Sequence, residues 1–314
     1  MRLAKLMTIG LLVFGLFSFT ACEEDNPIPS TPNIVELALD APELSSLVAA
    51  LQRANLVSAL EAAGTKTVFA PTNTAFQALL DSNPAWNTLE DIDIDLLTNV
   101  LLFHVIEGGV RAADLTNTYV PTLAKGPNDE PLSLQVDVSN GVNFNGSASP
   151  SSTDNEASNG VVHIIDEVML PPNVVTLALN NSDFSILVAA LTRADLTTDY
   201  VSVLTGDGPF TVFAPTNQAF ADLLDSNNEW NTLDDIPVAT LEAVLNYHVV
   251  SGANVQADQL TDNQDITALG GTFTTDLSNG AKLETSSGQS VDIVLTDVQG
   301  TNGVIHVVNT VLLP

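Results

Sequence analysis

The 314-residue sequence contains one cysteine, few aromatic residues and few positive charges. A single cysteine cannot form an internal disulfide, so an apolar core must hold each folded part together. Aromatic residues make up 5% of the chain against 45% apolar residues overall, so Leu, Val, Ile and Ala dominate that core. Eight Lys and Arg residues stand against 38 Asp and Glu residues, and the formal net charge is −30. Such a surface repels phosphate backbones and anionic lipid headgroups, which excludes nucleic acids as partners.

The first 22 residues have the layout of a bacterial export signal. Two basic residues precede an apolar run over 6–19, which is too short to span a membrane comfortably. The end of the run resembles a lipobox, because the chain's only cysteine, Cys22, follows two small residues. This resemblance implies a lipoprotein signal peptide region over 1–22 and a diacylglycerol on the Cys22 thiol. An ordinary secretory signal with an incidental cysteine is the alternative.

Residues 23–31 are predicted to form a short acidic and proline-rich tether. The cluster Glu23-Glu24-Asp25 resembles the surface-export signal of lipoproteins from the Bacteroidetes group, and a plain polar spacer is the alternative. Prolines stiffen the remainder, so the first domain should stay within about 20–30 Å of its membrane. We therefore expect an exported protein, lipid-anchored to the bacterial envelope at the outer membrane and facing the surface.

The rest of the sequence is one domain written twice. The segment TVFAPTN begins at Thr67 and recurs letter for letter at Thr211. LVAALQRA with LVAALTRA, two copies of LLDSN, two of WNTL, and NGVVHIID with NGVIHVVN repeat in the same order. The spacing of 140 to 144 residues is the size of a whole domain and too long for a solenoid unit. We predict domains over 32–170 and 171–314, joined almost without a linker and therefore held at a fairly fixed mutual angle.

Each copy begins with helical patterns and ends with strand patterns. Period-two alternation over 132–138, a turn at 139–141 and an apolar run over 161–165 predict strands in the first copy. Apolar residues three and four apart predict the helices before them. The helical stripes of the first copy are Leu44, Leu47, Val48 and Leu51; Phe76, Leu79 and Leu80; and Leu97, Val100, Leu101 and His104. Helices followed by antiparallel strands predict an α+β domain.

Polar residues before these stripes are predicted to cap the helices. We expect Asp40 and Asn180 to cap the first stripe of their copies, and Asn73 and Asn217 to cap the helix after TVFAPTN. The second copy is longer by four residues within 196–209, a glycine-containing segment that we expect to be a surface loop.

Three sequence boxes resemble the fasciclin-like domain family: TVFAPTN-x-AF, a Tyr-His pair after a helix, and NGVIHVVN. They occur in the same order in both copies and cover nearly all of the chain after the leader. The resemblance implies two tandem fasciclin-like domains, each a β-wedge or sandwich with helices packed along one edge, and a role in cell adhesion or matrix attachment. The structural family motif comprises Thr67, Phe69, Pro71, Asn73 and His163 in the first copy and Thr211, Phe213, Pro215, Asn217 and His306 in the second.

The same resemblance implies a candidate adhesion surface. In animal members of the family the Tyr-His segment is implicated in integrin binding, and it carries over to Tyr247 and His248. In the first copy Phe103 replaces the tyrosine before His104, so this position lacks the hydroxyl.

All four histidines belong to the repeated apolar stripes and strands. We expect each imidazole to be buried, neutral and bonded at both nitrogens, instead of serving as a metal ligand or catalytic base. Asp166 lies near His163, but Asn309 replaces it in the second copy, which argues against a fixed His-Asp dyad. With no cysteine available, zinc would lack ligands. We therefore expect no metal site and no cofactor.

The acidic segments that follow LLDSN in both copies lack the mid-loop glycine of a calcium-binding loop. We interpret them as capped helix ends and solvated turns. Trp86 and Trp230 in these segments are expected to pack against the domain, and a carbohydrate-stacking platform is the alternative.

These observations favour a membrane-anchored cell-surface adhesion protein that binds cells, matrix or biofilm polymer through a shallow protein surface. The alternative is a polysaccharide or small-ligand binding module of the cell envelope without an adhesive role. The sequence has no nucleophile elbow, phosphate loop or dinucleotide turn, so we expect no enzyme. A Ser-His dyad or carboxylate pair assembled only in three dimensions is the remaining enzymatic alternative.

Overall fold

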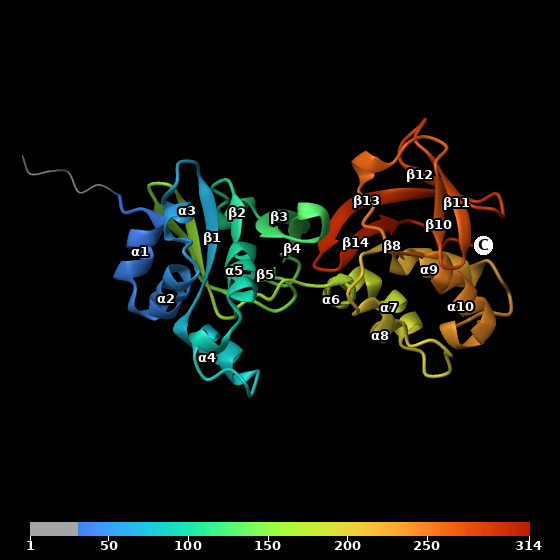
Figure 1. Cartoon of the computed structure of the whole chain (residues 1–314). Coiled ribbons are helices and arrows are strands. Elements are labelled where there is room, and N and C mark those ends of the chain that lie inside the picture. Colours follow the sequence, from blue (N-terminus) through green and yellow to red (C-terminus); the bar gives the residue numbers. More distant parts are fainter. Residues whose placement is uncertain (1–30) are drawn as a thin grey trace, which may run out of the picture. The chain divides into compact units, whose positions relative to one another are not determined.

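The structure is a computed structural model that describes residues 31–314 (Figure 1). Its helices and strands form two series that follow the same order along the chain. The predicted signal peptide, Cys22 and the acidic cluster after it lie outside the described residues, so these expectations stay predictions. Residues Thr31–Pro314 form one compact unit.

The first domain begins with three helices, continues with one strand and two more helices, and ends with six strands. Its helices are α1 (Ile34–Asp40), α2 (Ser45–Arg53), α3 (Val57–Glu61), α4 (Asn73–Asp81) and α5 (Ile94–Phe103). Its strands are β1 (Lys66–Pro71), β2 (Val105–Glu107), β3 (Thr118–Lys125), β4 (Pro131–Asp137), β5 (Asn143–Phe144), β6 (Pro150–Ala157) and β7 (Gly160–Ile165).

The second domain repeats this order, and Figure 1 shows its helices gathered on one side of its strands. Its helices are α6 (Val174–Asn180), α7 (Ser185–Leu191), α8 (Tyr200–Leu204), α9 (Asn217–Asp225) and α10 (Val238–Tyr247). Its strands are β8 (Phe210–Pro215), β9 (Val249–Ser251), β10 (Asp265–Ala268), β11 (Gly271–Asp276), β12 (Lys282–Glu284), β13 (Ser290–Gly300) and β14 (Gly303–Val308).

Each domain has one seven-stranded sheet, and the α+β prediction is confirmed. The strand orders are β5-β4-β3-β2-β1-β7-β6 and β10-β11-β12-β13-β14-β8-β9. The pairs β1–β7 and β8–β14 are parallel, and the other neighbours are antiparallel. The predicted final strands β7 and β14 are interior and buried along their whole length. Their buried faces explain why both read as continuous apolar runs.

The sheet separates two apolar cores in each domain. One core lies between the helices and the sheet and includes Leu47, Phe76 and Leu97 in the first domain. The other lies among the strands and includes Phe69, Phe103 and Phe144. The second domain repeats both cores. The helical stripes predicted from the sequence are the inward faces of α2, α4 and α5.

No single helix within 31–314 is both long and apolar enough to cross a membrane. Helix α6 together with Ser182–Leu191 meets the length and composition criteria as a pair, with a bend of 102° between its halves.

The prediction that Asn73 caps α4 is wrong. Thr72 is the N-cap, because its hydroxyl accepts the Ala75 N–H at 3.2 Å. The Asn73 carboxamide instead accepts the backbone N–H of Ser46 at 2.8 Å and donates to the Pro42 carbonyl at 2.9 Å. Asn73 therefore caps α2, a helix that begins 28 residues earlier in the chain. The prediction that Asp40 caps α2 is wrong for the same reason.

The second domain makes the same long-range cap. The Asn217 carboxamide accepts the Ile186 N–H at 2.9 Å and donates to the Ser182 carbonyl at 2.8 Å. Thr216 caps α9. Asn181, and not the predicted Asn180, accepts a local N–H at the start of this segment. The repeated asparagine thus joins two helices in both domains.

A second repeated asparagine ties the helices to the last strand. The Asn159 carboxamide accepts the Ile34 N–H at 2.9 Å and donates to the Leu60 carbonyl at 2.7 Å. Asn302 makes the equivalent bonds to Val174 and Leu204. The next residue, Gly160, allows the chains to approach closely, because a Cβ there would collide with the Lys66 carbonyl oxygen. The boxes NGVVHIID and NGVIHVVN therefore encode a junction between helices and sheet.

The expectation of a surface loop over 196–209 is only partly met. This segment contains the short helix α8, whose Tyr200 and Leu204 are 2% and 3% exposed. The Tyr200 hydroxyl lies 3.2 Å from the Asn246 carboxamide oxygen and donates to it. The four additional residues thus bring an aromatic side chain into the core of the second domain.

Hydrogen bonds join the two domains within the compact unit. The Gln299 N–H donates to the Ser133 hydroxyl at 2.9 Å, and Asn181 donates to the Tyr119 hydroxyl at 3.0 Å. Gln299 is 2% exposed, whereas its counterpart in the first domain is Glu156, an exposed carboxylate. A neutral amide thus replaces a charge where the strand becomes covered, as burial of an unpaired charge requires.

We predict that Asn73→Ala lowers the free energy of unfolding of the first domain by about 1–2 kcal/mol, because α2 loses its only side-chain cap. Calorimetry of the full chain measures this change. Gln77→Ala is the matched control on the same helix, since its side chain bonds only Asp81, and it should cost less than about 0.5 kcal/mol. Equal effects of the two substitutions would contradict the capping role.

Candidate functional site

The first residue of each TVFAPTN box makes two hydrogen bonds inside the sheet. The Thr67 hydroxyl donates to the Gly108 carbonyl at 2.7 Å and accepts the Val110 N–H at 2.8 Å. Thr211 makes the same pair of bonds in the second domain, at 2.9 Å each. Both threonines are 0% exposed. The threonine thus supplies hydrogen-bond partners for a carbonyl and an N–H group of a loop backbone, which would otherwise be buried without partners.

Phe69 and His163 face each other across the parallel strand pair β1–β7. The two residues are register partners, and their rings stack with centroids 5.7 Å apart. Phe213 and His306 repeat the stack at 5.4 Å. All four side chains are 0% exposed. The structural family motif is therefore internal at these positions.

The strand histidines are bonded at both ring nitrogens. His163 Nε2 donates to the Val110 carbonyl at 3.0 Å, and Nδ1 accepts the Asp154 N–H at 3.4 Å. His306 Nε2 donates to the Val255 carbonyl at 2.8 Å, and Nδ1 accepts from the backbone at 3.3 Å. Burial lowers the pKa of His306. Neither ring has a nitrogen left for a ligand or a proton transfer.

The helix-end histidines use the opposite tautomer. His104 Nδ1 donates to the Val100 carbonyl at 2.7 Å, and Nε2 accepts the Met169 N–H at 3.0 Å. His248 makes the same bonds with Val244 and Leu312 at 2.7 and 2.9 Å. Burial lowers the pKa of each imidazole to about 4. The expected burial and internal bonding at both ring nitrogens are confirmed for all four histidines.

The candidate adhesion surface predicted from the Tyr-His segment is contradicted by burial. Tyr247 and His248 are 1% and 3% exposed, and Phe103 and His104 are 0% and 2% exposed. The Tyr247 hydroxyl donates to the Thr272 carbonyl at 2.8 Å. A partner cannot touch side chains so placed while the domain is folded. These residues join the end of helix α5 or α10 to the sheet.

The acidic segments after LLDSN are helix caps and turns, as predicted. Asp91 accepts the N–H groups of Asn87 and Thr88 at 2.8 and 2.9 Å. These backbone hydrogen bonds lower the pKa of Asp91. Asp235 makes the same bonds in the second domain. Trp86 and Trp230 are partly buried and pack against the helical cores, which confirms their packing role.

Residues 31–314 contain no group of three His, Cys, Asp or Glu side chains arranged to hold a metal ion. Asp166, which follows β7, accepts the Ser149 N–H at 2.7 Å. His163 bonds elsewhere, to the backbone of Val110 and Asp154. The two side chains therefore form no dyad.

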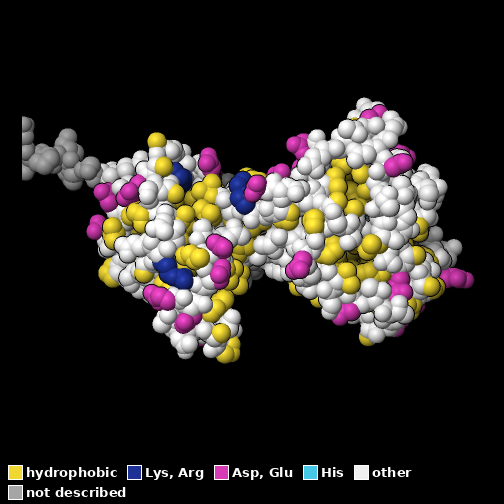
Figure 2. Space-filling model, in the orientation of Figure 1, with side chains coloured by type: hydrophobic (Ala, Val, Ile, Leu, Met, Phe, Trp, Pro, Cys, Tyr) yellow, Lys and Arg dark blue, Asp and Glu magenta, His cyan; other side chains and the backbone are white. Residues whose placement is uncertain are grey.

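The described surface is acidic, and its cations are largely committed to internal partners. Of the 38 acidic residues three precede residue 31, which leaves 35, against six Lys and Arg. On the face shown in Figure 2 carboxylates are scattered over both domains, while Lys and Arg appear in only a few places. Five of the six cations bind carboxylates or backbone carbonyls within 3.1 Å: Arg53, Lys66, Arg111, Arg193 and Lys282. Unpaired carboxylates therefore dominate the electrostatic field outside the molecule.

A polar hollow of about 290 Å³ was not predicted from the sequence. Its lining includes Asn117, Tyr119, Gln135, Asn181 and Asp183. Burial raises the pKa of Tyr119 to about 12, so its hydroxyl remains a neutral donor and acceptor. The Gln135 carboxamide oxygen is buried and has no hydrogen-bond partner among residues 31–314. These residues come from separate parts of the chain and share no spacing, so no sequence pattern indicates the hollow. We call this set the polar hollow.

We predict that the folded chain resists protonation at His104 and His248 down to pH about 4. Unfolded histidines bind protons near 6.5, so between 6.5 and about 4 the unfolded chain binds more protons than the folded one. The free energy of unfolding therefore falls as the pH drops through this window, by about 3 kcal/mol for each histidine, and is unaffected above it.

NMR titration of the histidine Cε1 protons checks this directly. The resonances of His104 and His248 should stay unshifted until about pH 4, and the same protons in the urea-unfolded chain should titrate near 6.5. A midpoint near 6.5 in the folded chain would contradict the buried bonding.

Comparison with known proteins agrees with this architecture. The sequence profile of the Fasciclin domain matches residues 42–171 and 182–314. Protein sll1483 of Synechocystis is 42% identical over 147 residues, which cover 46% of this chain and 76% of sll1483. Transforming growth factor-beta-induced protein ig-h3 of Sus scrofa is 30% identical over 258 residues, which cover 81% of this chain and 35% of ig-h3. These comparisons indicate no catalytic family.

The solved structure of a FAS1 domain pair from the insect cell adhesion molecule fasciclin I has the same fold. The alignment covers 87% of this chain and 97% of that chain, with a TM-score of 0.52 at 17% identity. With two matched regions, two equal series of elements and the motif residues in equivalent places, the chain belongs to the fasciclin domain family and contains two Fasciclin domains in tandem.

Proposed function

We propose that this chain is a cell-surface adhesion protein that binds cells, matrix or biofilm polymer through the exposed surface of its two Fasciclin domains. The observation that carries the proposal is the fold of residues 31–314, which matches both domains of the pair from an insect cell adhesion molecule. An adhesive module needs an outer surface for contact. Here the repeated motif residues on the strands are buried, and the half-buried Asn73 and Asn217 are hydrogen-bonded within their domains. Contact is then left to side chains outside the motif.

The charge of the surface narrows the range of partners. With 35 carboxylates and six cations in the described chain, partners with exposed Lys or Arg are attracted and polyanions are repelled. Adhesion through such a surface weakens as salt shortens the Debye length to about 8 Å at physiological ionic strength.

We propose in addition that Cys22 carries a lipid and that the domains face outward from the outer membrane. The position of the only cysteine after an apolar run supports this, as do the acidic residues that follow it. An anchored module resists detachment, because two or more acyl chains give stable membrane association.

We predict that cells lacking the protein attach to surfaces and aggregate less than wild-type cells, and that the full chain restores both. Protease treatment of intact cells should remove the domains. A chain with Tyr247→Phe should also restore attachment, because it loses only internal bonds, to the Thr272 carbonyl and from the Ser286 N–H. Normal attachment without the protein would refute adhesion. If the Tyr247→Phe chain fails to restore attachment although it is folded and present on the cell surface, the Tyr-His segment takes part in the adhesive contact.

The polar hollow favours a second candidate, a polysaccharide-binding module. Amide, hydroxyl and carboxylate side chains around a tyrosine ring suit the hydroxyl groups and apolar faces of sugars. A glycan array with the purified chain tests this without any partner cell.

We predict for this candidate that Asp183→Ala weakens glycan binding, because Asp183 lies in the lining of the hollow. Glu43→Ala is the matched control, since Glu43 occupies the equivalent exposed position in the first domain. An array with no bound glycan, or equal binding by both variants, would remove this candidate.

A further inference from the structure

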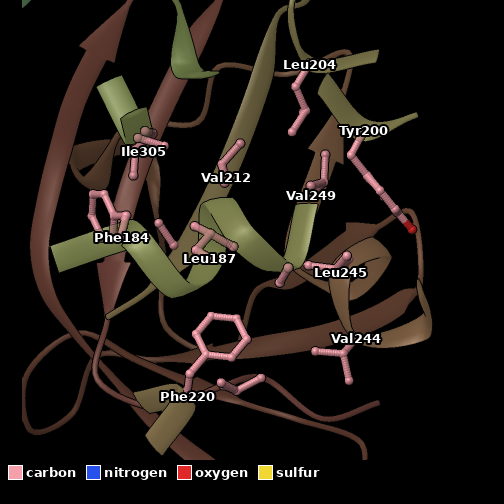
Figure 3. Close-up of a cluster of buried hydrophobic side chains, with 14 of the residues drawn as sticks. Phe184, Leu187, Tyr200, Leu204, Val212, Phe220, Val244, Leu245, Val249 and Ile305 are labelled. Atoms are coloured by element: carbon pink, nitrogen blue, oxygen red, sulfur yellow. The ribbon is translucent and has the colours of Figure 1, made fainter. Parts of the chain in front are cut away.

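A pocket with an almost entirely aliphatic lining lies within the second domain. Its volume is about 150 Å³, and residues of α6, α7, α8, β8 and β14 line it. Twelve of its thirteen lining residues are Val, Leu, Ile or Ala, and the thirteenth is Thr192. Figure 3 shows Leu187 on a helix, with Val212 and Ile305 on the strands behind it. We call this the apolar pocket.

The first domain has closely similar residues at these positions but covers them more completely. Val35 and Leu51 are 5% and 4% exposed there. Their counterparts in the second domain, Val175 and Leu191, are half-buried and line the apolar pocket. The exposure of these aliphatic side chains therefore comes from the backbone around them and not from a change in residue type.

The connection between two helices accounts for the difference. In the first domain α2 ends at Arg53 and three residues lead to α3, with the Leu56 N–H bonded to the Leu51 carbonyl at 2.9 Å. In the second domain α7 ends at Leu191 and eight residues lead to α8 at Tyr200. The longer connection makes no such bond to Leu191 and leaves its side chain partly uncovered.

A carboxylate on α10 holds the longer connection in place. Glu242 Oε1 accepts the Thr197 hydroxyl at 2.7 Å, and the N–H groups of Thr197 and Thr198 at 2.6 and 3.1 Å. The first domain has Thr98 at the position of Glu242, and it has no equivalent connection to hold. The lining of the apolar pocket is thus common to both domains, whereas the connection beside it and the carboxylate that holds this connection belong to the second domain.

The size and lining of the pocket restrict what can fill it. A cavity of about 150 Å³ lined by aliphatic side chains stays dry and accepts a group the size of benzene. A sugar would lose its hydrogen bonds there, since Thr192 is the only polar residue of the lining. A complete lipid chain is much larger than the pocket. One aromatic or branched aliphatic side chain fits.

Charge beside the pocket restricts the neighbours of that side chain. The connection that borders it carries Asp195 and Asp199. Arg193 is bonded to Asp195 at 2.7 Å and to the carbonyls of Leu233 and Ile236. Within the described residues Asp199, which caps α8 through Ser202, is therefore the carboxylate of this connection that has no cation beside it. A segment that brings Lys or Arg next to its apolar residue therefore meets complementary charge.

We propose that the apolar pocket receives one aromatic or branched aliphatic side chain from a protein partner, presented on a segment with adjacent Lys or Arg residues. A buried apolar anchor with a charged rim is the usual arrangement of the residues that dominate protein interfaces. The inference rests on the proposed function only in taking a protein as the partner.

The first arm of the test measures whether the pocket is open. Benzene added to the full chain should shift the methyl NMR resonances of Leu187, Val212 and Ile305. Val188→Phe fills the pocket and should weaken benzene binding by about ten-fold or more. Val48→Phe, at the equivalent half-buried position of the first domain, should leave it unchanged. Circular dichroism confirms that both variants are folded.

The second arm identifies the occupant. A short peptide with one phenylalanine between lysines should displace benzene and bind about ten-fold or more tightly than the same peptide with alanine. Exchange of its lysines for glutamates should also weaken binding, and Val188→Phe should abolish the preference for phenylalanine.

Three results would overturn the proposal: no benzene shifts in the pocket, no displacement by millimolar lysine-flanked phenylalanine peptide, or tighter binding of decane than of this peptide. Attachment assays separate this inference from the proposed function. If Val188→Phe cells attach like wild type while deletion cells do not, adhesion stands and the pocket has no part in it. If deletion cells attach normally, adhesion falls and the peptide result still decides the pocket.

Discussion

Parallel pairing of the first and last strands of each domain is the constraint on which the rest of the fold depends. Strand β1 pairs with β7 along its whole length, although α4, α5 and the strands β2 to β6 lie between them in the sequence. The pair carries Thr67, Phe69 and His163, and Asn159 just before β7 ties the first helices to it. Because both faces of the pair are buried, every polar group along it must find an internal partner. The repeated sequence boxes are the residues that meet this requirement.

The motif of the family therefore describes how the domain holds together. Each histidine bonds through both nitrogens, and each repeated asparagine closes a gap between elements distant in sequence. Such buried networks stabilise the fold only when every member has its partner, which explains why the two copies keep the same letters. Differences between the copies are found instead where the chain has freedom, as at Glu242 and at the connection it holds. Specific recognition is more readily acquired at such positions than at the shared motif.

The sequence was most informative about features with a local period. The stripes of α2, α4 and α5, the buried strand β7 and the packing of Trp86 all follow from spacing and apolar content. Pairing and capping across long distances were not predictable in the same way. Asn73 precedes an apolar stripe and so resembles a local cap, but its partner is a helix already completed. The helical period of α5 places His104 on the stripe that faces the core, and His104 is buried there. The prediction from this period was therefore correct, whereas the contact role implied by the family resemblance was not. The residues that line the polar hollow follow no regular spacing in the sequence, so no pattern indicates it. The apolar pocket is indicated in the sequence only by the four additional residues of the second copy.

The pairing of most Lys and Arg side chains within the chain affects how neighbouring molecules of the protein repel one another. Arg53 and Arg193 are bonded to backbone carbonyls, and Lys282 to Asp292, so few positive groups remain to bridge neighbouring molecules. Copies of the chain brought close together therefore repel one another. Multivalent counter-ions or added electrolyte would weaken this effect, since screening shortens the range of the repulsion.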